Sequence, residues 1–226
     1  MPKVSVVIPA LDEAAQIEAA VASAFAAGAA EVLVADGGSR DATREIAEAA
    51  GAIVSSSEAG RGRQLNAGAA RAEGDVLLFL HADTRLPDGA VAAVVAAVDR
   101  GVVFGGFRLA FAEERLALRV GAFLINLRTR LTRAPWGDQA QFVRRDVFER
   151  AGGFRDIPIM EDYELAMRMK RYGRRGVLPL KVVTSGRRFL AVGVARTVAL
   201  NWWTILRWHL GVSPDELAET YRGVTR

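Results

Sequence analysis

Gly74-Asp75-Val76-Leu77-Leu78-Phe79-Leu80-His81-Ala82-Asp83-Thr84 is the stretch that decides the fold of this chain. The five apolar residues 76–80 are too few for a typical helix and are bounded by Gly74 and by polar groups. Such a run is typical of a strand that is buried on both faces, as in a parallel sheet. Ligands bind beyond the carboxyl ends of strands in open α/β sheets, so His81 and Asp83 are candidate ligands of a metal or a phosphate. The alternative is an ordinary strand followed by a polar turn.

The chain before this stretch repeats a pattern of short apolar runs, each followed by a helical pattern. Strands are predicted over residues 4–8, 31–35 and 52–55. Asp12 and Asp41 are predicted to cap the helices that follow the first two strands. This alternation with short loops predicts an α/β fold with a doubly wound, mostly parallel, Rossmann-like sheet flanked by helices.

The second half of the chain is less regular. Gly105-Gly106 predicts a bulge in a strand over Val102–Phe111, and Pro179 predicts that a strand over residues 177–183 lies at a sheet edge. Between them, a helix is predicted whose apolar face carries Leu116, Val120, Phe123, Leu124, Leu127 and Leu131. A last helix is predicted over residues 194–210. We therefore predict one domain over residues 1–193, with halves 1–100 and 101–193, and a helical appendage over residues 194–226.

Composition narrows the classes of function. The 226 residues include no cysteine, which excludes disulfides, thiolate catalysis and cysteine-ligated metals. The net charge of +4 comes mainly from arginine, whose planar group suits phosphate, and no nucleic-acid module is recognisable, so nucleic acid is not an expected partner. A strand pattern begins at Lys3 and no uncharged apolar run reaches the length of a spanning helix. We expect a cytoplasmic protein.

A Gly- and Arg-rich segment, residues 58–68, opens a helix and carries Arg61 and Arg63. Amides at a helix start beside guanidinium groups form an anion site, although a solvated basic loop is an equal alternative. The chain has no dinucleotide fingerprint and no Walker loop, and its two histidines, His81 and His209, do not lie in a hydrolase context. A site of oxygen ligands and arginines suits a diphosphate substrate with a hard divalent ion.

The chain resembles the family 2 glycosyltransferases of GT-A fold. The matching segments are residues 6–13, 36–43, 66–68, 81–83 and 160–162. Residues 61–68, 80–84 and 137–139 are most similar to a bacterial family-2-like branch named for its association with radical-SAM and selenium-domain proteins. The resemblance implies a hexosyltransferase-like, inverting enzyme that moves a sugar from a nucleoside-diphosphate sugar to an unidentified hydroxyl acceptor.

The resemblance also implies roles for individual residues. The implied donor-binding residues are Pro9, Ala10, Leu11, Glu13, Asp36, Gly38, Arg61, Arg63, Gln64, Ala82 and Asp83. Asp83 would hold Mg²⁺ or Mn²⁺ against the diphosphate, while His81 replaces the family's first aspartate and is either a second ligand or a structural histidine. Asp162, or else Glu161, is the implied general base. Trp136, Gly137, Asp138 and Gln139 form either an acceptor wall or a packed loop.

Two alternatives from other classes stay open. A sugar nucleotidyltransferase would normally carry a glycine-rich triphosphate loop with a lysine near the first strand, which residues 9–13 lack. A noncatalytic sugar-nucleotide-binding protein would bind the donor without turnover. In the last helix, Trp202, Trp203 and Trp208 beside Arg196 and Arg207 fit a core or homodimer contact, or an interfacial helix at the inner face of the cell membrane, which would imply a lipid acceptor.

Overall fold

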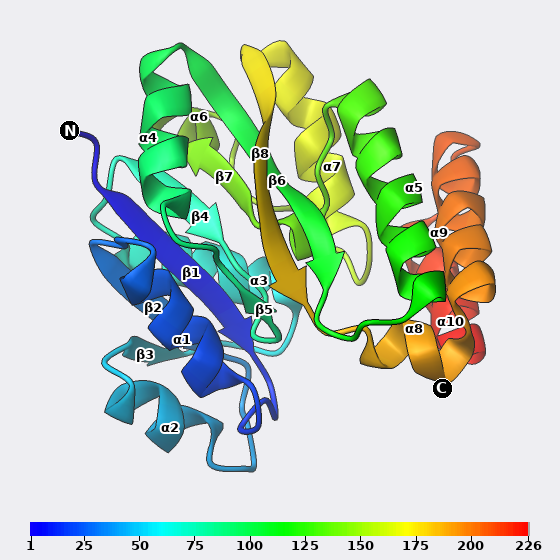
Figure 1. Cartoon of the computed structure of the whole chain (residues 1–226), viewed down its shortest axis with the longest axis horizontal. Coiled ribbons are helices and arrows are strands. Elements are labelled where there is room, and N and C mark those ends of the chain that lie inside the picture. The colour runs from blue at the N-terminus through cyan, green and yellow to red at the C-terminus, as the bar shows by residue number, and fades with distance from the viewer. Residues whose placement is uncertain (226) are drawn as a thin grey trace.

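The computed structural model describes residues 1–225 and has a curled, mixed sheet with helices on both faces (Figure 1). The strand order is β3-β2-β1-β4-β7-β6-β8-β5. The strands are β1 (Val4–Ala10), β2 (Glu31–Asp36), β3 (Ile53–Ser56), β4 (Val76–Phe79), β5 (Thr84–Arg85), β6 (Val102–Phe111), β7 (Gln141–Arg144) and β8 (Arg174–Thr184). The helices are α1 (Ile17–Ala26), α2 (Thr43–Ala49), α3 (Arg61–Arg71), α4 (Ala90–Asp99), α5 (Leu116–Thr132), α6 (Arg145–Arg150), α7 (Glu161–Arg168), α8 (Arg187–Val192), α9 (Val194–His209) and α10 (Pro214–Thr225). Two 3-10 turns, η1 (Gly137–Gln139) and η2 (Met169–Arg171), complete the elements.

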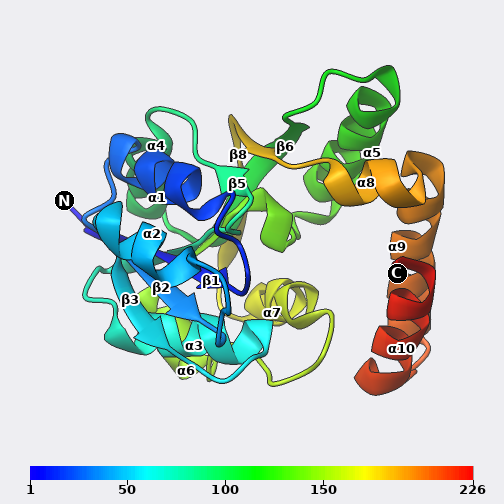
Figure 2. The same cartoon turned by 90° about the horizontal axis from the view of Figure 1, so that it is seen from below.

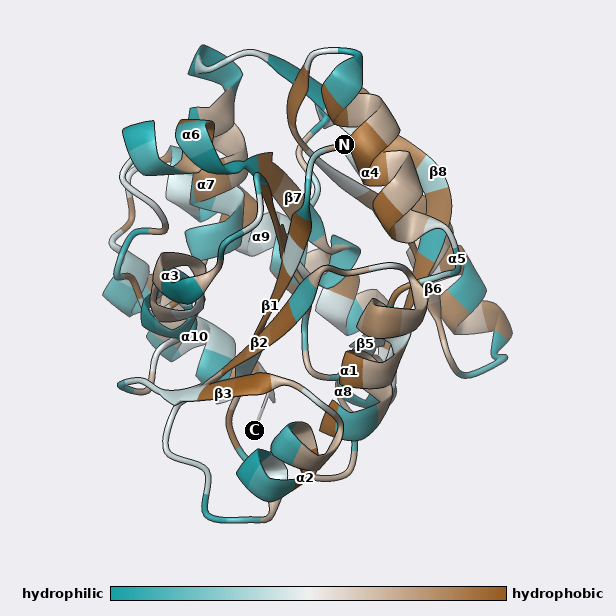
Figure 3. Cartoon of the chain, turned by 90° about the vertical axis from the view of Figure 1, so that its left-hand side faces the viewer, coloured by the Kyte–Doolittle hydropathy of each residue, from teal (hydrophilic) through white to brown (hydrophobic). Residues whose placement is uncertain are grey.

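Residues 74–84 contribute the strand β4, which lies near the centre of the sheet. All four residues of β4 are buried, and the strand pairs in parallel with β1 on one side and antiparallel with β7 on the other. The strands β3, β2, β1 and β4 are all parallel, which confirms the Rossmann-like first half. Figure 3 shows the apolar colouring of β1, β2 and β3, as expected for strands covered by helices.

Alternate residues of β1 enter two separate cores. Val6 packs with residues of α1 and α4, whereas Val7 packs with residues of α3, α6 and α7. The contact with α3 depends on Gly68, because a Cβ at that position would lie 2.4 Å from Cγ1 of Val7. Gly68 therefore lets α3 lie directly on the sheet, and this holds the first turn of α3 beside the carboxyl end of β1.

The strand β6 has the predicted irregularity, but it does not lie at the two glycines. Register shifts occur on either side of them, between Val102 and Phe104 and between Phe107 and Arg108. A Cβ at Gly105 would lie 2.5 Å from the carbonyl oxygen of Gly176. The two glycines are needed because the neighbouring strand β8 approaches so closely here. The register shifts lie at the larger residues on either side of them.

The prediction of an edge strand at Pro179 was also wrong in part. The strand β8 pairs along its length with β6, and the two-residue β5 lies outside it, opposite Val183 and Thr184. Pro179 falls in the register shift between the Leu178 and Lys181 pairs. The missing N–H of proline is thus accommodated by a bulge.

The two predicted caps have different outcomes. Asp12 has a φ of 54° and accepts a hydrogen bond from the backbone N–H of Arg40, so it ties two loops together and does not cap α1. Asp41 accepts from the N–H of Thr43, the first residue of α2, and from the N–H of Ala14. Both carboxylates therefore fix the loops that follow β1 and β2.

The helix α5 is present, but its apolar face points to solvent. Leu118, Gly121 and Ala122 are its inward-facing apolar residues, whereas the six residues of the predicted apolar face are all exposed. The helix lies beside α9, which packs in turn on α10 (Figures 1 and 2). The helix α10 lies within the predicted helical appendage, residues 194–226, although only one helix, over residues 194–210, was predicted there. None of the helices in residues 1–225 combines the length and hydropathy that crossing a membrane requires.

Candidate active site

A cavity of about 860 Å³ lies at the carboxyl ends of β1 and β4. Its walls come from the segment after β1, the first turn of α3, the segment after β4, the start of α7 and the helices α8, α9 and α10. The predicted residues that line it are Pro9, Ala10, Leu11, Glu13, Arg61, Gln64, His81, Ala82, Asp83, Trp136, Asp138, Glu161 and Asp162. Residues more than 150 positions apart in sequence thus share one cavity.

Five predicted site residues do not line this cavity: Asp36, Gly38, Arg63, Gly137 and Gln139. Asp36 is fully buried and accepts hydrogen bonds from the N–H groups of Gly38 and Ser39. Arg63 forms ion pairs with Glu58 at 2.9 Å and with Asp156 at 2.8 Å, outside the cavity. The donor-binding roles of Asp36, Gly38 and Arg63 stay predictions.

Gln64 lines the cavity and braces the sheet at the same time. Its amide nitrogen donates to the carbonyl oxygens of Ala10 at 2.8 Å and of Ala35 at 2.9 Å, at the ends of β1 and β2. The side chain is buried, and these two hydrogen bonds satisfy both N–H donors of its amide group. Gln64 therefore fixes the spacing of the two strand ends that carry the predicted nucleotide pocket.

His81 and Asp83 follow β4 and both line the cavity. Burial, helped by the charges of Arg61 and Arg188, lowers the pKa of His81 to about 3, so its ring is neutral at physiological pH. Burial and the nearby charge of Asp83 raise the pKa of Glu13. Within residues 1–225, no three His, Asp or Glu side chains converge on a point that could hold a metal ion.

This donor set fits a metal that is shared with a substrate. Asp83 offers a carboxylate and His81 a neutral imidazole, and Mg²⁺ in proteins is often held by one or two carboxylates plus substrate phosphates and water. Mn²⁺ accepts an imidazole more readily than Mg²⁺. Asp83 and His81 are therefore the residues that would hold a divalent ion here, with its remaining ligands supplied by a diphosphate and water.

Arg61 and Glu161 form an ion pair of 3.1 Å across the cavity. Glu161 is almost fully buried, and burial raises the pKa of its carboxyl group while Arg61 opposes that change. The helix α3 can pack against the segment that contains Arg155 because Gly62 has no side chain: a Cβ there would lie 2.6 Å from the carbonyl oxygen of Arg155. About half of the Arg61 side chain remains exposed, so its guanidinium group can bind an anion in the cavity.

Asp162 opens α7 and is held by backbone groups. Its Oδ2 accepts from the N–H of Gly137 at 2.6 Å, and its Oδ1 accepts from the N–H of Tyr163 at 2.6 Å. A Cβ at Gly137 would lie 2.6 Å from Nε2 of His81 and 3.0 Å from Oδ2 of Asp162. Gly137 is thus the point at which the candidate metal ligand and the candidate base meet.

The segment from Trp136 to Gln139 divides into two parts. Gln139 is fully buried: its Oε1 accepts from Arg128 at 3.0 Å and from Thr129 at 2.8 Å, and its Nε2 donates to the carbonyl of Phe107 at 3.1 Å. Trp136 and Asp138 face the cavity, and burial raises the pKa of Asp138 to about 6 despite the charge of Arg128. The packed-loop interpretation fits Gln139, whereas the acceptor-wall interpretation fits Trp136 and Asp138.

The C-terminal helices supply lining residues that the sequence analysis did not assign to the site. Arg187 and Arg188 open α8, and Arg187 lies 3.7 Å from the carboxylate of Glu13. Tyr221 of α10 donates to the side-chain oxygen of Asn201 in α9 at 3.1 Å. The adjacent arginines gave some signal in the sequence, but Asn201 and Tyr221 gave none, because their position depends on how three helices pack.

A model of the family described as "Glycosyl transferase family 2" matches residues 5–155. The chain belongs to this family. The matched region includes the first four strands of the sheet and the His81–Asp83 segment, while α7 to α10 lie beyond it. The family is the one that the resemblance implied.

Solved structures show the same fold. TarS from S. aureus has a TM-score of 0.67 at 20% identity, over 81% of this chain and 36% of that chain. Glucosyl-3-phosphoglycerate synthase from Mycobacterium tuberculosis, in complex with Mg²⁺ and uridine-diphosphate, has a TM-score of 0.58 at 22% identity, over 81% of this chain and 70% of that chain. The same enzyme with Mn²⁺, uridine-diphosphate and phosphoglyceric acid has a TM-score of 0.57 at 23% identity, over 81% of this chain and 69% of that chain.

These neighbours confirm the α/β, GT-A class. The predicted C-terminal helical segment is present as α9 and α10, which pack on α5 and α8. The chain spans only about a third of the full TarS structure, so it matches one part of that protein. A search of proteins with curated descriptions gave no match.

Proposed function

We propose that the protein is an inverting transferase that moves a sugar from a nucleoside-diphosphate sugar to a hydroxyl acceptor. The observation that carries the proposal is the cavity shared by Asp83, Arg61 and Asp162, which come from three separate segments of the chain. One carboxylate with a neutral imidazole suits a metal-bound diphosphate, Arg61 suits its negative charge, and a second carboxylate suits a base.

In the proposed reaction, Asp162 takes the proton of the acceptor hydroxyl. The acceptor oxygen then forms a bond to the anomeric carbon while the bond from that carbon to the diphosphate oxygen breaks, and the electron pair leaves with the diphosphate. Attack from the face opposite the leaving group inverts the anomeric configuration. Arg61 binds the negative charge that develops on the leaving group. A divalent ion held by Asp83 and His81 would offset the same charge when bound.

The contacts favour Asp162 over Glu161 as the base. Glu161 is buried and already engaged in the ion pair with Arg61. Each carboxylate oxygen of Asp162 accepts one backbone N–H, which fixes the group and leaves further lone pairs free for an acceptor. We propose that Glu161 positions Arg61 and that Asp162 reacts.

Several finer points belong to the same proposal. We place the chain in the radical-SAM- and selenium-domain-associated branch, divide it at residue 193, and assign Trp136 and Asp138 to the acceptor side. Glucosyl-3-phosphoglycerate synthase binds uridine-diphosphate with Mg²⁺ or Mn²⁺, so uridine-diphosphate sugars are the first donors to test. The alternatives are a noncatalytic sugar-nucleotide-binding protein and a nucleotidyltransferase; the first would bind donors without turnover, and the second would release pyrophosphate from a nucleoside triphosphate.

The test is to incubate the protein with a panel of nucleoside-diphosphate sugars, Mn²⁺ and candidate hydroxyl acceptors, and to follow release of the nucleoside diphosphate. The anomeric configuration of the product is then read by NMR. Release that depends on the acceptor and gives an inverted anomer supports the proposal. Retention of configuration, or nucleotide binding without release from any donor, contradicts it.

A further inference from the structure

The outer surface formed by α5 and α9 is the most apolar exposed region of the described chain. On α5, Phe123 is 64% exposed and Leu131 is 76% exposed; on α9, Trp202 is 53% exposed. The apolar patch, as we define it, consists of Leu116, Val120, Phe123, Leu124, Leu127, Leu131, Trp202, Trp203, Leu206 and Leu210. Soluble monomers rarely leave so many large apolar side chains in one exposed region without a partner.

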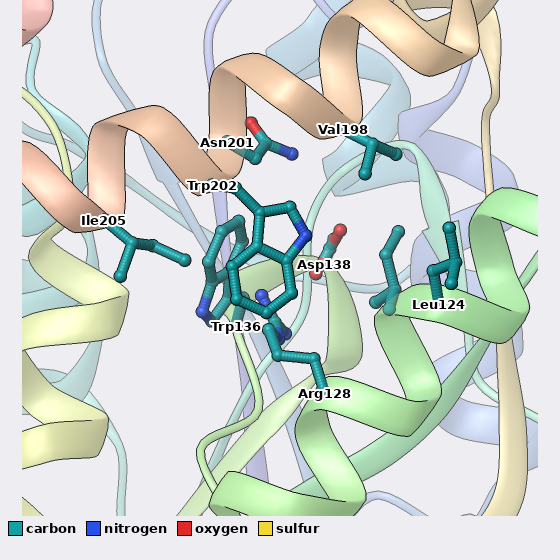
Figure 4. A pocket seen from close by; sticks show the side chains of 9 residues that line it. Leu124, Arg128, Trp136, Asp138, Val198, Asn201, Trp202 and Ile205 are labelled. Carbon is teal, nitrogen blue, oxygen red and sulfur yellow. The ribbon is translucent and has the colours of Figure 1, made fainter.

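The two helices present these residues on one continuous face. A Cβ at Gly121, in α5, would lie 3.0 Å from Cγ1 of Val194 at the start of α9, so the helices touch near their N-terminal ends. Further along, a narrow slot between them is lined by Leu124, Ile125 and Arg128 from α5 and by Val198, Asn201, Trp202 and Ile205 from α9 (Figure 4). The helices therefore run side by side in the same direction. Leu124 and Trp202 are exposed and also line the slot, so the patch crosses from one helix to the other there.

The charged residues within α5 and α9 are all basic. Neither α5 nor α9 contains an Asp or a Glu residue. At about 100° per residue, Arg119 and Arg130 project from the edge of α5 that lies away from α9, and Arg196 projects from the edge of α9 that lies away from α5. All three are exposed. Tryptophans and leucines bordered by arginines match the headgroup region of a bilayer that contains anionic lipids.

We propose that the patch binds the surface of an anionic membrane, with its apolar side chains in the headgroup region and the three arginines at anionic headgroups. The helix α5 supplies more than half of the apolar contact, so the membrane face is larger than the C-terminal helix alone. No spanning helix is involved.

The position of the slot favours a membrane over a second copy of the chain. Trp136, Asp138 and Asn201 line both the slot and the large cavity, so the patch borders the acceptor side of the site. The slot itself has a volume of about 20 Å³, room for about one water molecule, and would have to widen to admit an acceptor. A second copy on the patch would cover this entrance, whereas a membrane would present hydroxyl-bearing lipids to it; this step rests on the proposed function.

The test is sedimentation with vesicles of phosphatidylcholine, alone or with about one-quarter phosphatidylglycerol. The double variant Phe123→Glu with Trp203→Glu, neither of which lines the slot or the cavity, should lower the vesicle partition coefficient at least about tenfold. The double variant Arg119→Glu with Arg130→Glu should abolish the preference for phosphatidylglycerol and the sensitivity of binding to salt.

The matched controls lie on the first half of the chain. Phe25→Glu with Ile53→Glu changes two other exposed apolar residues, and Arg71→Glu changes another exposed arginine. Both controls should bind vesicles as the unchanged protein does. Circular dichroism and urea unfolding of every variant separate lost binding from lost folding.

The proposal would be overturned if the protein bound neither vesicle, or if the control variants lost binding to the same extent. It would also be overturned by a stable dimer in analytical ultracentrifugation that does not bind vesicles and that the Phe123→Glu and Trp203→Glu changes dissociate. Donor binding, measured in the same variants by calorimetry with uridine-diphosphate and Mn²⁺, should be unchanged. Vesicle binding without donor binding would contradict the proposed function and leave the membrane face intact, and the reverse result would contradict only the membrane face.

Discussion

Oδ2 of Asp162 accepts a hydrogen bond of 2.6 Å from the backbone N–H of Gly137. This contact joins the first residues of α7 to the loop that precedes β7, two segments separated by 25 positions in the sequence. The same glycine packs against His81, so the candidate base and the segment after β4 are placed by one backbone group. A shift of this loop would therefore move the base relative to the donor.

Asp162→Asn should keep donor binding and lose transfer. The amide oxygen can still accept the N–H of Gly137, while the NH2 group cannot accept the N–H of Tyr163 and cannot take a proton from the acceptor. A positioned base contributes about 10²–10⁴-fold to the rate. We expect kcat to fall at least about 100-fold while the calorimetric affinity for the nucleoside diphosphate with Mn²⁺ changes little. Asp99→Asn, which removes an exposed carboxylate at the end of α4 and outside the cavity, is the matched control and should retain activity. Retained turnover in Asp162→Asn would move the base elsewhere.

Gly137→Ala should reduce turnover more than donor affinity. The new Cβ would lie 2.6 Å from Nε2 of His81 and 3.0 Å from Oδ2 of Asp162, and neither group can withdraw without losing its position. We expect kcat to fall at least about tenfold with the thermal unfolding curve still cooperative. Gly223→Ala, where an added Cβ has no neighbour within 4 Å, should behave as the unchanged protein. Equal activity of Gly137→Ala and Gly223→Ala would contradict this prediction, because it would show that the loop can move without loss of activity.

The sheet was predictable because its first half obeys local rules. Buried parallel strands are predicted by the apolar run Val76 to Leu80 and by the three apolar runs before it. These strands determine where Asp83 and the segment after Pro9 lie. The register shifts of β6 and the place of Pro179 were not predictable, since they follow from contacts between strands far apart in sequence. The predicted cap at Asp12 was wrong for a related reason: its side chain accepts from the backbone N–H of Arg40, far along the chain, and not from an N–H of α1.

The part of the site that family motifs mark was predictable, and the part that the C-terminal helices complete was not. Asp83, Arg61 and Asp162 converge as the resemblance implied, but Asn201 and Tyr221 enter the cavity through packing of α9 and α10. The apolar spacing of α5 predicted a helix correctly and says nothing about which side faces the core. A periodic apolar face is usually buried, and here the small residues Gly121 and Ala122 face inward instead.

Removal of divalent metal should weaken nucleotide binding through Asp83. In the unchanged protein, adding a chelator should lower the affinity for uridine-diphosphate at least about tenfold, because the diphosphate loses the ion that neutralises it. In Asp83→Ala the affinity should already be low and the chelator should have little further effect. Calorimetry of both proteins with and without Mn²⁺ measures this coupling. If chelation weakens binding in Asp83→Ala as much as in the unchanged protein, the ion is held by other residues.

The contribution of Asp138 to stability should fall as pH rises between about 4 and 6, while that of His81, whose pKa is lowered, rises over the same window. Burial raises the pKa of the Asp138 carboxyl group from 3.8 to about 6 in the folded protein. Within this window the folded chain keeps a proton that the unfolded chain has released, so the contribution of Asp138 is fully present below pH 4 and is lost as pH passes 6. The loss amounts to at most about 3 kcal/mol of the free energy of unfolding for a shift from 3.8 to about 6.

Urea unfolding at several pH values between 4 and 7 measures this effect as the difference between two proteins: Asp138→Asn should gain stability relative to the unchanged protein as pH rises, because its side chain does not titrate. Asp146→Asn is the control. Burial opposes the hydrogen bonds from Arg150 and Arg144 at Asp146, and the net result is a pKa below 3.8, so its titration lies outside the window. If this pH-dependent difference is absent for Asp138→Asn and present for Asp146→Asn, the proton is not held by Asp138. The expected pattern would instead show that the acceptor side of the cavity holds a neutral carboxyl group in mildly acidic solution, able to donate a hydrogen bond to an acceptor oxygen.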